Sequence, residues 1–208
     1  MYSGITRGLF PVIELEERAG VTRFTVELSP ELARNVELGA SIALDGVCLT
    51  VVAYEGVRVS FEAIAETLSR TTLAELGVGR RVSVERSVRV GDEMGGHDVF
   101  GHVLGTGEVV ARGNVGEQLD LTIAVPASWM KYILRKGFVA LDGSSLTVGD
   151  VQTSAGQGRF EVHLIPETLR LTGFANKQVG SRVNVELDPR TVAIVDTVER
   201  VLAERASV

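Results

Sequence analysis

The sequence predicts an all-β protein in which two related small barrels follow one another and an amphipathic helix ends the chain. The first observation is an internal repeat: residues 43–51 read Ala-Leu-Asp-Gly-Val-Cys-Leu-Thr-Val and residues 140–148 read Ala-Leu-Asp-Gly-Ser-Ser-Leu-Thr-Val. Gly46 and Gly143 stand 97 positions apart in a chain of 208 residues, which indicates duplication of a whole domain. The second is a series of short strand-like segments between Gly and Asp turns, typical of β-barrels, and the third is a helical period after Pro189.

The first half contains the pattern of several strands and one helical turn. Residues 1–12 lead into residues 22–28, where apolar and polar side chains alternate as in a half-buried strand. Ser29 before Pro30 predicts one short helical turn. The β-branched run at 41–53 is interrupted by Asp45-Gly46, a pair that favours a hairpin turn. The remaining predicted elements are a strand at 57–64, a brief helix at 66–73 and a strand at 78–85.

The second half repeats this order. Residues 101–109 match residues 4–12 at the offset of 97, and we match residues 160–169 with 61–68. Glu-Thr-Leu recurs at Glu66 and Glu167 at an offset of 101, which we attribute to a longer hairpin around Gly156. The predicted domains are a first barrel at 1–96, a second barrel at 97–189 and a helix at 190–208, with the boundary in a glycine-rich segment.

The terminal helix has no counterpart in the first half. Its apolar stripe comprises Val192, Val195, Val198 and Leu202, with Ile194 and Val201 beside it. Such a stripe must cover an apolar surface. We keep two interpretations: the helix packs on its own barrel, or it bundles with the helices of other subunits.

Composition and charge exclude several classes of protein. The net charge is −6 and the basic residues are scattered, so we expect no nucleic-acid partner. We also expect no membrane partner, because no run approaches the roughly eighteen apolar residues that span a bilayer. A single cysteine and the absence of a secretion signal favour a cytoplasmic protein.

Motifs for nucleotide, phosphate or nucleophilic-elbow chemistry are missing. Metal binding has little support, since His97, His102 and His163 with Cys48 offer too few ligands and no recognised spacing. We further expect His97 and His102 to lie on opposite faces of a strand, because five residues separate them. The prediction is that the protein binds no metal.

The duplication predicts two related pockets, which suit two copies of one ligand or a ligand with internal symmetry. Polar groups recur at Thr50 and Thr147 and would hydrogen-bond a ligand rich in oxygen and nitrogen. The alternative is that these hydroxyls close turns and that Cys48 fills core volume. Overlaying the halves gives as lining candidates Gly4, Ile5, Thr6, Cys48, Leu49, Thr50, Glu62, Ala63, Ile64, Ala65, Glu66 and Thr67 with Gly101, His102, Val103, Ser145, Leu146, Thr147, His163, Leu164, Ile165, Pro166, Glu167 and Thr168.

These same segments resemble the riboflavin synthase family, alpha-chain type. The similar stretches are Met-Tyr-Ser-Gly-Ile at the start, residues 39–51, Gly-Gly-His-Asp-Val-Phe-Gly-His-Val at 95–103, residues 136–148, and His-Leu-Ile-Pro-Glu-Thr-Leu at 163–169. They occur in the family's order, and the resemblance runs from Met1 to about Ala203.

The resemblance implies a dismutation, in which two molecules of 6,7-dimethyl-8-ribityllumazine exchange a four-carbon unit to give riboflavin and 5-amino-6-ribitylaminouracil. It implies no cofactor and no metal. The family fold is two six-stranded Greek-key barrels with a C-terminal helix, assembled as a homotrimer through the helices. The active site holds two lumazines between the first barrel of one subunit and the second barrel of another. An association with lumazine synthase is left open.

Roles carried over from the family fall on five candidate catalytic residues. His102 is the expected proton shuttle, and Cys48, Ser145 and Thr147 are expected to act as hydrogen-bonding groups or transient nucleophiles. Asp188 would complete the second-barrel half of the site. The same resemblance adds Lys136 to the substrate-binding candidates.

The chain also departs from the family pattern at Phe100, Leu104 and residues 173–175. Two other classes compete with the enzyme. One is a non-catalytic carrier resembling the lumazine proteins, against which the intact second-domain motifs argue. The other is the flavin-binding barrel of a reductase, which would lack its nicotinamide domain in this chain.

Overall fold

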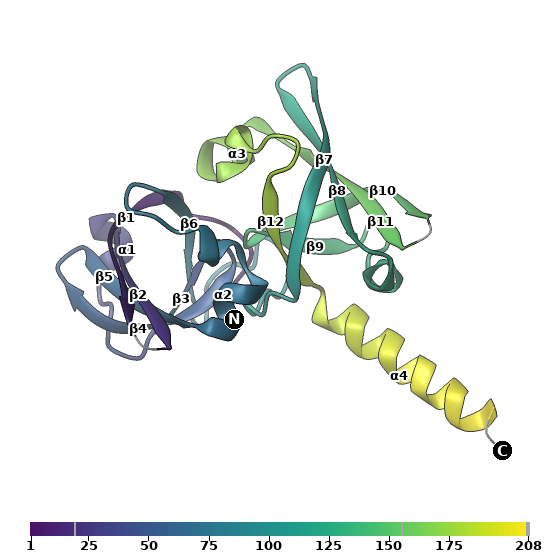
Figure 1. The fold of residues 1–208 in the computed structure, drawn as a ribbon, viewed down its shortest axis with the longest axis horizontal. Helices are drawn as coiled ribbons and strands as arrows, with labels where there is room; N and C mark the ends of the chain where they lie inside the picture. Colours follow the sequence, from purple (N-terminus) through teal and green to yellow (C-terminus); the bar gives the residue numbers. More distant parts are fainter. Residues whose placement is uncertain (19, 155, 207–208) are drawn as a thin grey trace.

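A computed structural model describes residues 1–18, 20–154 and 156–206 of the chain. Two β-barrels lie side by side, and a single long helix extends away from them (Figure 1). Each barrel is closed, six-stranded and antiparallel, which confirms the predicted fold class. None of the described helices is long and apolar enough to cross a membrane.

The first barrel has the strand order β1-β2-β5-β4-β3-β6. Its strands are β1 (Leu9–Arg18), β2 (Val21–Glu27), β3 (Ser41–Leu44), β4 (Val47–Glu55), β5 (Arg58–Ile64) and β6 (Arg81–Arg86). Its short helices are α1 (Pro30–Ala33), α2 (Ala65–Arg70) and η1 (Thr72–Glu75).

The second barrel has the same cyclic order of equivalent strands. Its strands are β7 (Gly105–Val115), β8 (Gln118–Pro126), β9 (Phe138–Leu141), β10 (Ser144–Ser154), β11 (Gln157–Leu164) and β12 (Arg182–Leu187). Its short helices are η2 (Ala127–Tyr132), α3 (Pro166–Leu171) and η3 (Gly173–Asn176), and α4 (Pro189–Ala206) ends the chain.

Turn chemistry explains the repeated hairpins. Asp45 and Gly46 have φ angles of 44° and 78°, and Asp142 and Gly143 have 43° and 82°. Two successive residues in the left-handed region are what a type I′ turn requires, and its twist matches that of the flanking strands. The hydroxyl of Ser29 accepts from the backbone N–H of Leu32 and so caps α1. The predicted hairpin and helical turn are both confirmed.

The hairpin between β10 and β11 is longer than the equivalent hairpin between β4 and β5, as predicted. In the first barrel the pairing of β4 with β5 ends at Glu55 and Arg58, whereas β10 and β11 continue for two further pairs, ending at Ser154 and Gln157. Those four added residues account for the change of offset from 97 to 101. Val148 pairs with Val162 as Val51 pairs with Phe61. The match of residues 160–169 with 61–68 was therefore wrong at its start, because Val162 and not Phe160 is equivalent to Phe61.

β1 runs beyond the predicted lead-in to Arg18, because pairing with β2 requires only backbone groups and not an apolar pattern.

Each barrel encloses its own apolar core. The first contains Phe24 and Phe61 and the second Phe160 and Phe174, all at most 1% exposed.

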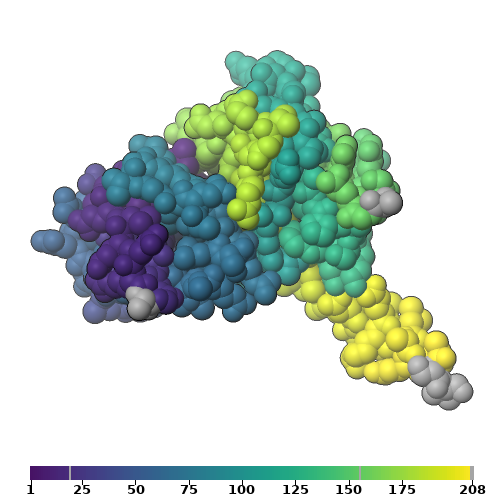
Figure 2. All heavy atoms as spheres, in the orientation of Figure 1, coloured from purple at the N-terminus to yellow at the C-terminus, as the bar shows by residue number. Residues whose placement is uncertain are grey.

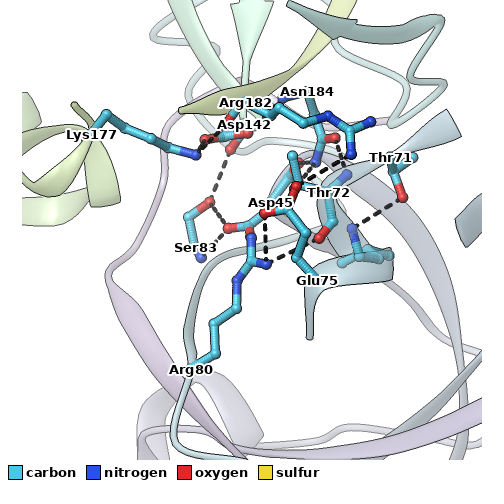
Figure 3. Close-up of polar contacts among 11 residues, drawn as sticks. Asp45, Thr71, Thr72, Glu75, Arg80, Ser83, Asp142, Lys177, Arg182 and Asn184 are labelled. Carbon is cyan, nitrogen blue, oxygen red and sulfur yellow. Dashed lines mark hydrogen bonds and ion pairs between the residues drawn. The ribbon is translucent and has the colours of Figure 1, made fainter. Parts of the chain in front are cut away.

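Equivalent positions of the two barrels meet each other across an approximate two-fold relation. Tyr2 and Val99 form a β-bridge, and a Cβ on Gly46 would lie 2.4 Å from the backbone nitrogen of Gly143. Buried side chains close the contact (Figure 3): the Asn184 amide donates to the Asp45 carbonyl at 2.7 Å.

The same contact is completed by two hydroxyl residues. The backbone N–H of Thr72 donates to the Asn184 side-chain oxygen at 2.7 Å, and the Ser83 hydroxyl donates to the Asp142 carbonyl at 2.9 Å (Figure 3). Because these groups are buried and paired, each barrel fixes the position of the other.

Helix α4 contacts the second barrel in its first half and through Glu199, which pairs with Lys131 of η2. Val192 packs against the second core, and Tyr132 in η2 donates to Asp196. No residue of α4 is buried, and the helix extends outward from the two barrels (Figures 1 and 2). Packing on its own barrel therefore leaves Val198 and Leu202 of the apolar stripe 51% and 59% exposed.

Candidate functional site

Two short crossing segments, one around Gly4 and one around Gly101, run between the barrels and bring the repeated motifs together. The backbone N–H of Cys48 donates to the carbonyl of Gly101 at 3.0 Å, and that of Ser145 donates to the carbonyl of Gly4 at 2.8 Å. Gly101 and Val103 thus lie against the first barrel, whereas Gly4 lies against the second. Each repeated motif therefore lies against a segment from the other half of the chain.

Glycine is required at both crossings. Gly101 has a φ angle of +76° and a Cβ there would lie 2.5 Å from the Cβ of Cys48. Gly4 has a φ angle of +74° and a Cβ would lie 2.5 Å from the Cβ of Ser145. Both the left-handed backbone and the close approach exclude a side chain.

Two buried glutamates anchor these segments. Glu85 accepts from the backbone N–H and the hydroxyl of Ser3, both at 2.7 Å, and Glu186 accepts from the N–H groups of Phe100 and Gly101 at 2.7 and 2.9 Å. Burial raises the pKa of both carboxyls, and the same hydrogen bonds partly oppose the rise. Sequence reasoning missed both as functional residues, although they end the repeated Val-x-Val-Glu segments.

The first-barrel patch lies where β4 begins and β5 ends, since these antiparallel strands are neighbours. Cys48 is half-buried, Thr50 is exposed and Ile64 is 54% exposed. Val103 is half-buried and packs on the first core from the crossing segment. The patch therefore offers a thiol, a hydroxyl and apolar surface side by side.

Other first-barrel candidates have different surroundings. Leu49 and Ala63 belong to the core, and Glu62 lies within 4.0 Å of Arg18 and 3.9 Å of Arg23. The three candidates in α2 are exposed or half-buried: Ala65, Glu66 and Thr67. Glu66 pairs with Arg70, and the carbonyl of Thr67 accepts from the hydroxyl of Thr71.

The second-barrel patch has the same plan at the start of β10 and the end of β11. Ser145 is half-buried, Thr147 is exposed and Ile165 is 59% exposed. Leu146 and Leu164 belong to the core. The equivalent positions thus present a hydroxyl where the first barrel presents a thiol.

The remaining second-barrel candidates are mostly engaged with neighbours. The Thr6 hydroxyl is 3.0 Å from that of Ser144, and His163 Nδ1 is 2.7 Å from Asp120. Lys136 is exposed with a φ angle of +65°, in the place of Gly39 in the first barrel. Ile5 is half-buried in the crossing segment, Pro166 is exposed, Glu167 pairs with Arg170, and the Thr168 carbonyl accepts from Thr172.

Sequence reasoning also missed His97. Its Nδ1 is 2.7 Å from the Ser145 hydroxyl, and its ring stacks on Phe138 with 5.0 Å between centroids. Its Nε2 is the one buried side-chain nitrogen or oxygen without a partner in the described residues. An unpaired buried polar atom costs about 1–3 kcal/mol. Burial also lowers the pKa of His97.

The expectation that His97 and His102 lie on opposite faces of a strand was wrong, because neither residue is in a strand. A connection stretches from Ser87 to Leu104 there, held by the bridge between Val99 and Tyr2 and by hydrogen bonds instead of a ladder. Among the described residues, no group of three or more His, Cys, Asp or Glu side chains could hold a metal ion.

His102 is exposed and its ring lies 6.2 Å from that of Phe100. Both residues line a cavity of about 740 Å³ between the second barrel, η2 and α4, which Trp129 and Val192 also line. Of the predicted site residues, only His102 lines this cavity. Its imidazole therefore follows Gly101 in sequence but faces a concave surface beside the terminal helix.

Two further contacts bear on the predicted roles. The Tyr2 hydroxyl donates to the Cys48 sulfur at 3.1 Å, and burial raises the pKa of Tyr2 so that it stays neutral. Asp188 caps α4, because one carboxylate oxygen accepts from the N–H and the hydroxyl of Thr191 at 3.1 and 2.6 Å. The carboxylate of Asp188 thus has a structural partner already.

Comparison with known proteins places both halves in one family. The family model described as lumazine binding domain matches residues 3–87 and 100–188. Riboflavin synthase of Escherichia coli (strain K12) is 45% identical over 206 residues, covering 99% of this chain and 95% of that protein. Riboflavin synthase of Brucella abortus (strain 2308) is 40% identical over 195 residues, covering 90% of this chain and 93% of that protein.

Solved structures show the same fold. LumP complexed with riboflavin has a TM-score of 0.80 at 23% identity, covering 90% of this chain and 100% of that one. LumP complexed with 6,7-dimethyl-8-(1'-D-ribityl) lumazine has a TM-score of 0.79 at 22% identity, covering 90% and 99%. Since the sequence match to riboflavin synthases extends over nearly the whole chain, the chain belongs to the riboflavin synthase family, with one lumazine-binding domain in each barrel.

Proposed function

We propose that this chain is a riboflavin synthase, which converts two molecules of 6,7-dimethyl-8-ribityllumazine into riboflavin and 5-amino-6-ribitylaminouracil. The observation that carries the proposal is the 45% identity to a riboflavin synthase over 99% of the chain. The two related patches, one on each barrel, support it because the reaction joins two identical molecules. A four-carbon unit passes from one lumazine to the other, and the products together contain every atom of the substrates.

The chemistry depends first on alignment. One lumazine loses a proton from its 7-methyl group and becomes a carbon nucleophile, and C7 of the other accepts the attack. Holding two planar rings face to face can lower the barrier by about 7–11 kcal/mol, because translational and rotational freedom is already lost. Proton transfer by side chains adds a smaller factor of about 10²–10⁴.

The residues take roles that follow from their surroundings. Thr50 and Thr147 are exposed on equivalent strands and would hydrogen-bond the heterocycles. Cys48 and Ser145 would act next to the reacting carbons, and the exposed His102 would carry the proton. Lys136 and Asp188 complete the proposed second-barrel half, where the helix-capping bonds of Asp188 favour a role in holding the start of α4.

The assembly proposed with this function is a homotrimer bundled through α4, with each active site between the first barrel of one chain and the second barrel of another. The exposed apolar stripe supports it, since Ile194 and Leu202 are 65% and 59% exposed and nothing in the described chain covers them. Trimerisation would also bring a neighbour to the cavity that His102 lines. A cytoplasmic location and an association with lumazine synthase belong to the proposal through family resemblance alone.

An assay with lumazine as the sole organic substrate tests the activity. Purified protein is mixed with 6,7-dimethyl-8-ribityllumazine and a chelator, and riboflavin absorbance is followed. Formation of riboflavin supports the proposal. Tight binding of lumazine that persists unchanged would instead identify a carrier, the alternative that the fold shared with LumP raises.

Mixing two impaired variants tests the shared active site. Cys48→Ala damages the first-barrel half and Ser145→Ala the second-barrel half, so neither homotrimer has an intact site. After subunits exchange, a site between chains would be intact in about a quarter of cases by random mixing in a cyclic trimer. Recovery of activity on mixing supports the intersubunit site, and no recovery would place each site within one chain.

A further inference from the structure

We propose that His97 is a positioning residue of the second-barrel pocket, where its imidazole fixes the Ser145 hydroxyl as a hydrogen-bond donor to the bound lumazine. The inference rests on the proposed function and deepens it. His102, and not His97, is the histidine to which family resemblance assigns a role. His97 is identified by what surrounds it in the structure.

The imidazole of His97 is held by two contacts of different kinds. Nδ1 lies 2.7 Å from the Ser145 oxygen, a short distance for a neutral hydrogen bond. The ring also lies nearly parallel to Phe138, at 14° between planes. Phe138 pairs across the sheet with Thr147, another residue of the same pocket. Stacking and hydrogen bonding together leave the ring one orientation.

The backbone before His97 is shaped for this approach. A Cβ on Gly96 would lie 2.2 Å from the carbonyl oxygen of Ser3 and 2.7 Å from the Cβ of Ser145. Only glycine fits between the crossing segment and Ser145. Three features of residues 96 and 97 therefore hold the imidazole next to the Ser145 hydroxyl: the absence of a side chain on Gly96, the stacking of His97 on Phe138, and the hydrogen bond between His97 and Ser145.

The protonation of His97 determines which atom donates. Burial is the largest influence on its pKa and lowers it, while Asp188 and Asp98 oppose the shift and Arg190 adds to it. The neutral ring carries one N–H. Since buried N–H groups without a partner are rarer than unpaired acceptors, the unpartnered Nε2 is the bare nitrogen and Nδ1 carries the hydrogen. Nδ1 then donates to Ser145, whose own hydrogen is left to donate elsewhere.

The first barrel holds its equivalent group differently. Cys48 stands where the second barrel has Ser145, and its sulfur accepts from the Tyr2 hydroxyl at 3.1 Å. The group that contacts Cys48 is a phenol hydroxyl, whereas the group that contacts Ser145 is an imidazole nitrogen. The Cys48 sulfur therefore already accepts a hydrogen bond within the protein, whereas the Ser145 hydroxyl is left free to donate to the lumazine. Two identical lumazines would meet unlike polar groups, as a reaction that gives them different roles requires.

Two substitutions separate the hydrogen bond from the packing. His97→Phe keeps a flat ring to stack on Phe138 and removes both nitrogens, whereas His97→Asn can place an amide N–H near the position of Nδ1. We expect His97→Phe to lower kcat about 10- to 100-fold with a smaller change in KM, and His97→Asn to recover part of that loss. The thermal midpoint of His97→Phe should not fall, since the unpaired nitrogen is gone. Tyr54→Phe, an exposed aromatic outside the site, is the control and should match wild type.

A double-variant comparison gives the decisive result. If His97 acts through Ser145, Ser145→Ala lowers kcat to a similar extent and the combined His97→Phe and Ser145→Ala variant is no slower than either alone. Multiplying losses, or His97→Phe with more than half the wild-type kcat, would overturn the proposal.

A readout independent of activity keeps this test apart from that of the function. Nitrogen-15 NMR of labelled imidazoles should show His97 in the Nδ1–H form near neutral pH, and Ser145→Ala should shift those signals. An unchanged His97 spectrum in Ser145→Ala would refute the contact whatever the activity. A wild-type protein that makes no riboflavin but shows the coupled signals would instead refute the proposed function.

Discussion

Replacing Gly101 by alanine tests whether the crossing segment sets the first-barrel site. An added Cβ would stand 2.5 Å from the Cβ and 2.7 Å from the backbone nitrogen of Cys48, where ordinary contact begins at 3.4 Å. The segment must therefore move by about 1 Å, and a rotamer change cannot relieve the clash with the backbone. A misplacement of that size costs about 100-fold in rate, or about 2.7 kcal/mol of barrier. The residue displaced with Gly101 is His102.

Gly91→Ala is the matched control for this prediction. Gly91 lies in the same connection, has a φ angle of +97° and has nothing within 4 Å of an added Cβ. The unfolding free energy of Gly91→Ala should fall by about 1–2 kcal/mol, because alanine is disfavoured in the left-handed region, and the activity should be nearly that of wild type. Initial rates of riboflavin formation and urea unfolding of both variants give the comparison. A Gly101→Ala enzyme within threefold of the Gly91→Ala rate would refute the reasoning.

Three further predictions concern assembly, pH and the first-barrel thiol. Ile194→Asp puts a charge beside the apolar stripe of α4 and should give monomers in sedimentation velocity, whereas the proposed bundle predicts trimers for wild type and Arg200→Ala; a trimeric Ile194→Asp variant would contradict the bundle. Burial raises the pKa of Asp45 from 3.8 to about 6, so the folded state keeps a proton that the unfolded chain loses. The contribution of Asp45 to stability is therefore present below about pH 4 and is lost as the pH rises through about 6. In urea titrations, the unfolding free energy of Asp45→Asn relative to wild type should rise over that pH range. A difference that does not change with pH would contradict the shift. Tyr2→Phe removes the hydrogen bond to the Cys48 sulfur and should cost about 0.5–1.5 kcal/mol in the same titrations; a loss well above that range would contradict the assignment of an ordinary neutral hydrogen bond.

Much of the fold follows from local signals in the sequence. The Asp-Gly pairs at 45–46 and 142–143 predict hairpins because those residues tolerate positive φ, and both turns have that geometry. The apolar stripe after Pro189 predicts a helix because its period is 3.6 residues, and α4 spans Pro189–Ala206. Such signals depend only on neighbours along the chain.

The exchange of crossing segments could not be predicted in the same way. The backbone N–H of Cys48 donates to Gly101 and that of Ser145 donates to Gly4, so each motif is contacted by a segment from the other half of the sequence. A repeat of motifs is the same whether a segment stays with its own barrel or crosses to the other one. The distinction depends on contacts between residues about 50 and 140 positions apart.

His97 illustrates the same limit for the site. Its sequence context, Gly-Gly-His, gives no sign of a partner at Ser145, since 48 residues separate the two side chains. Leu49 and Leu146, which were predicted to line the site, have their side chains in the two cores, because successive side chains of a strand point to opposite faces.

The stoichiometry of the reaction tests the central claim most directly. Purified protein, lumazine and a chelator are incubated to completion, and lumazine, riboflavin and 5-amino-6-ribitylaminouracil are quantified by chromatography. A dismutation between two pockets predicts one riboflavin and one uracil product for every two lumazines consumed. Riboflavin without an equal amount of the uracil, or bound lumazine that is never consumed, would contradict the account.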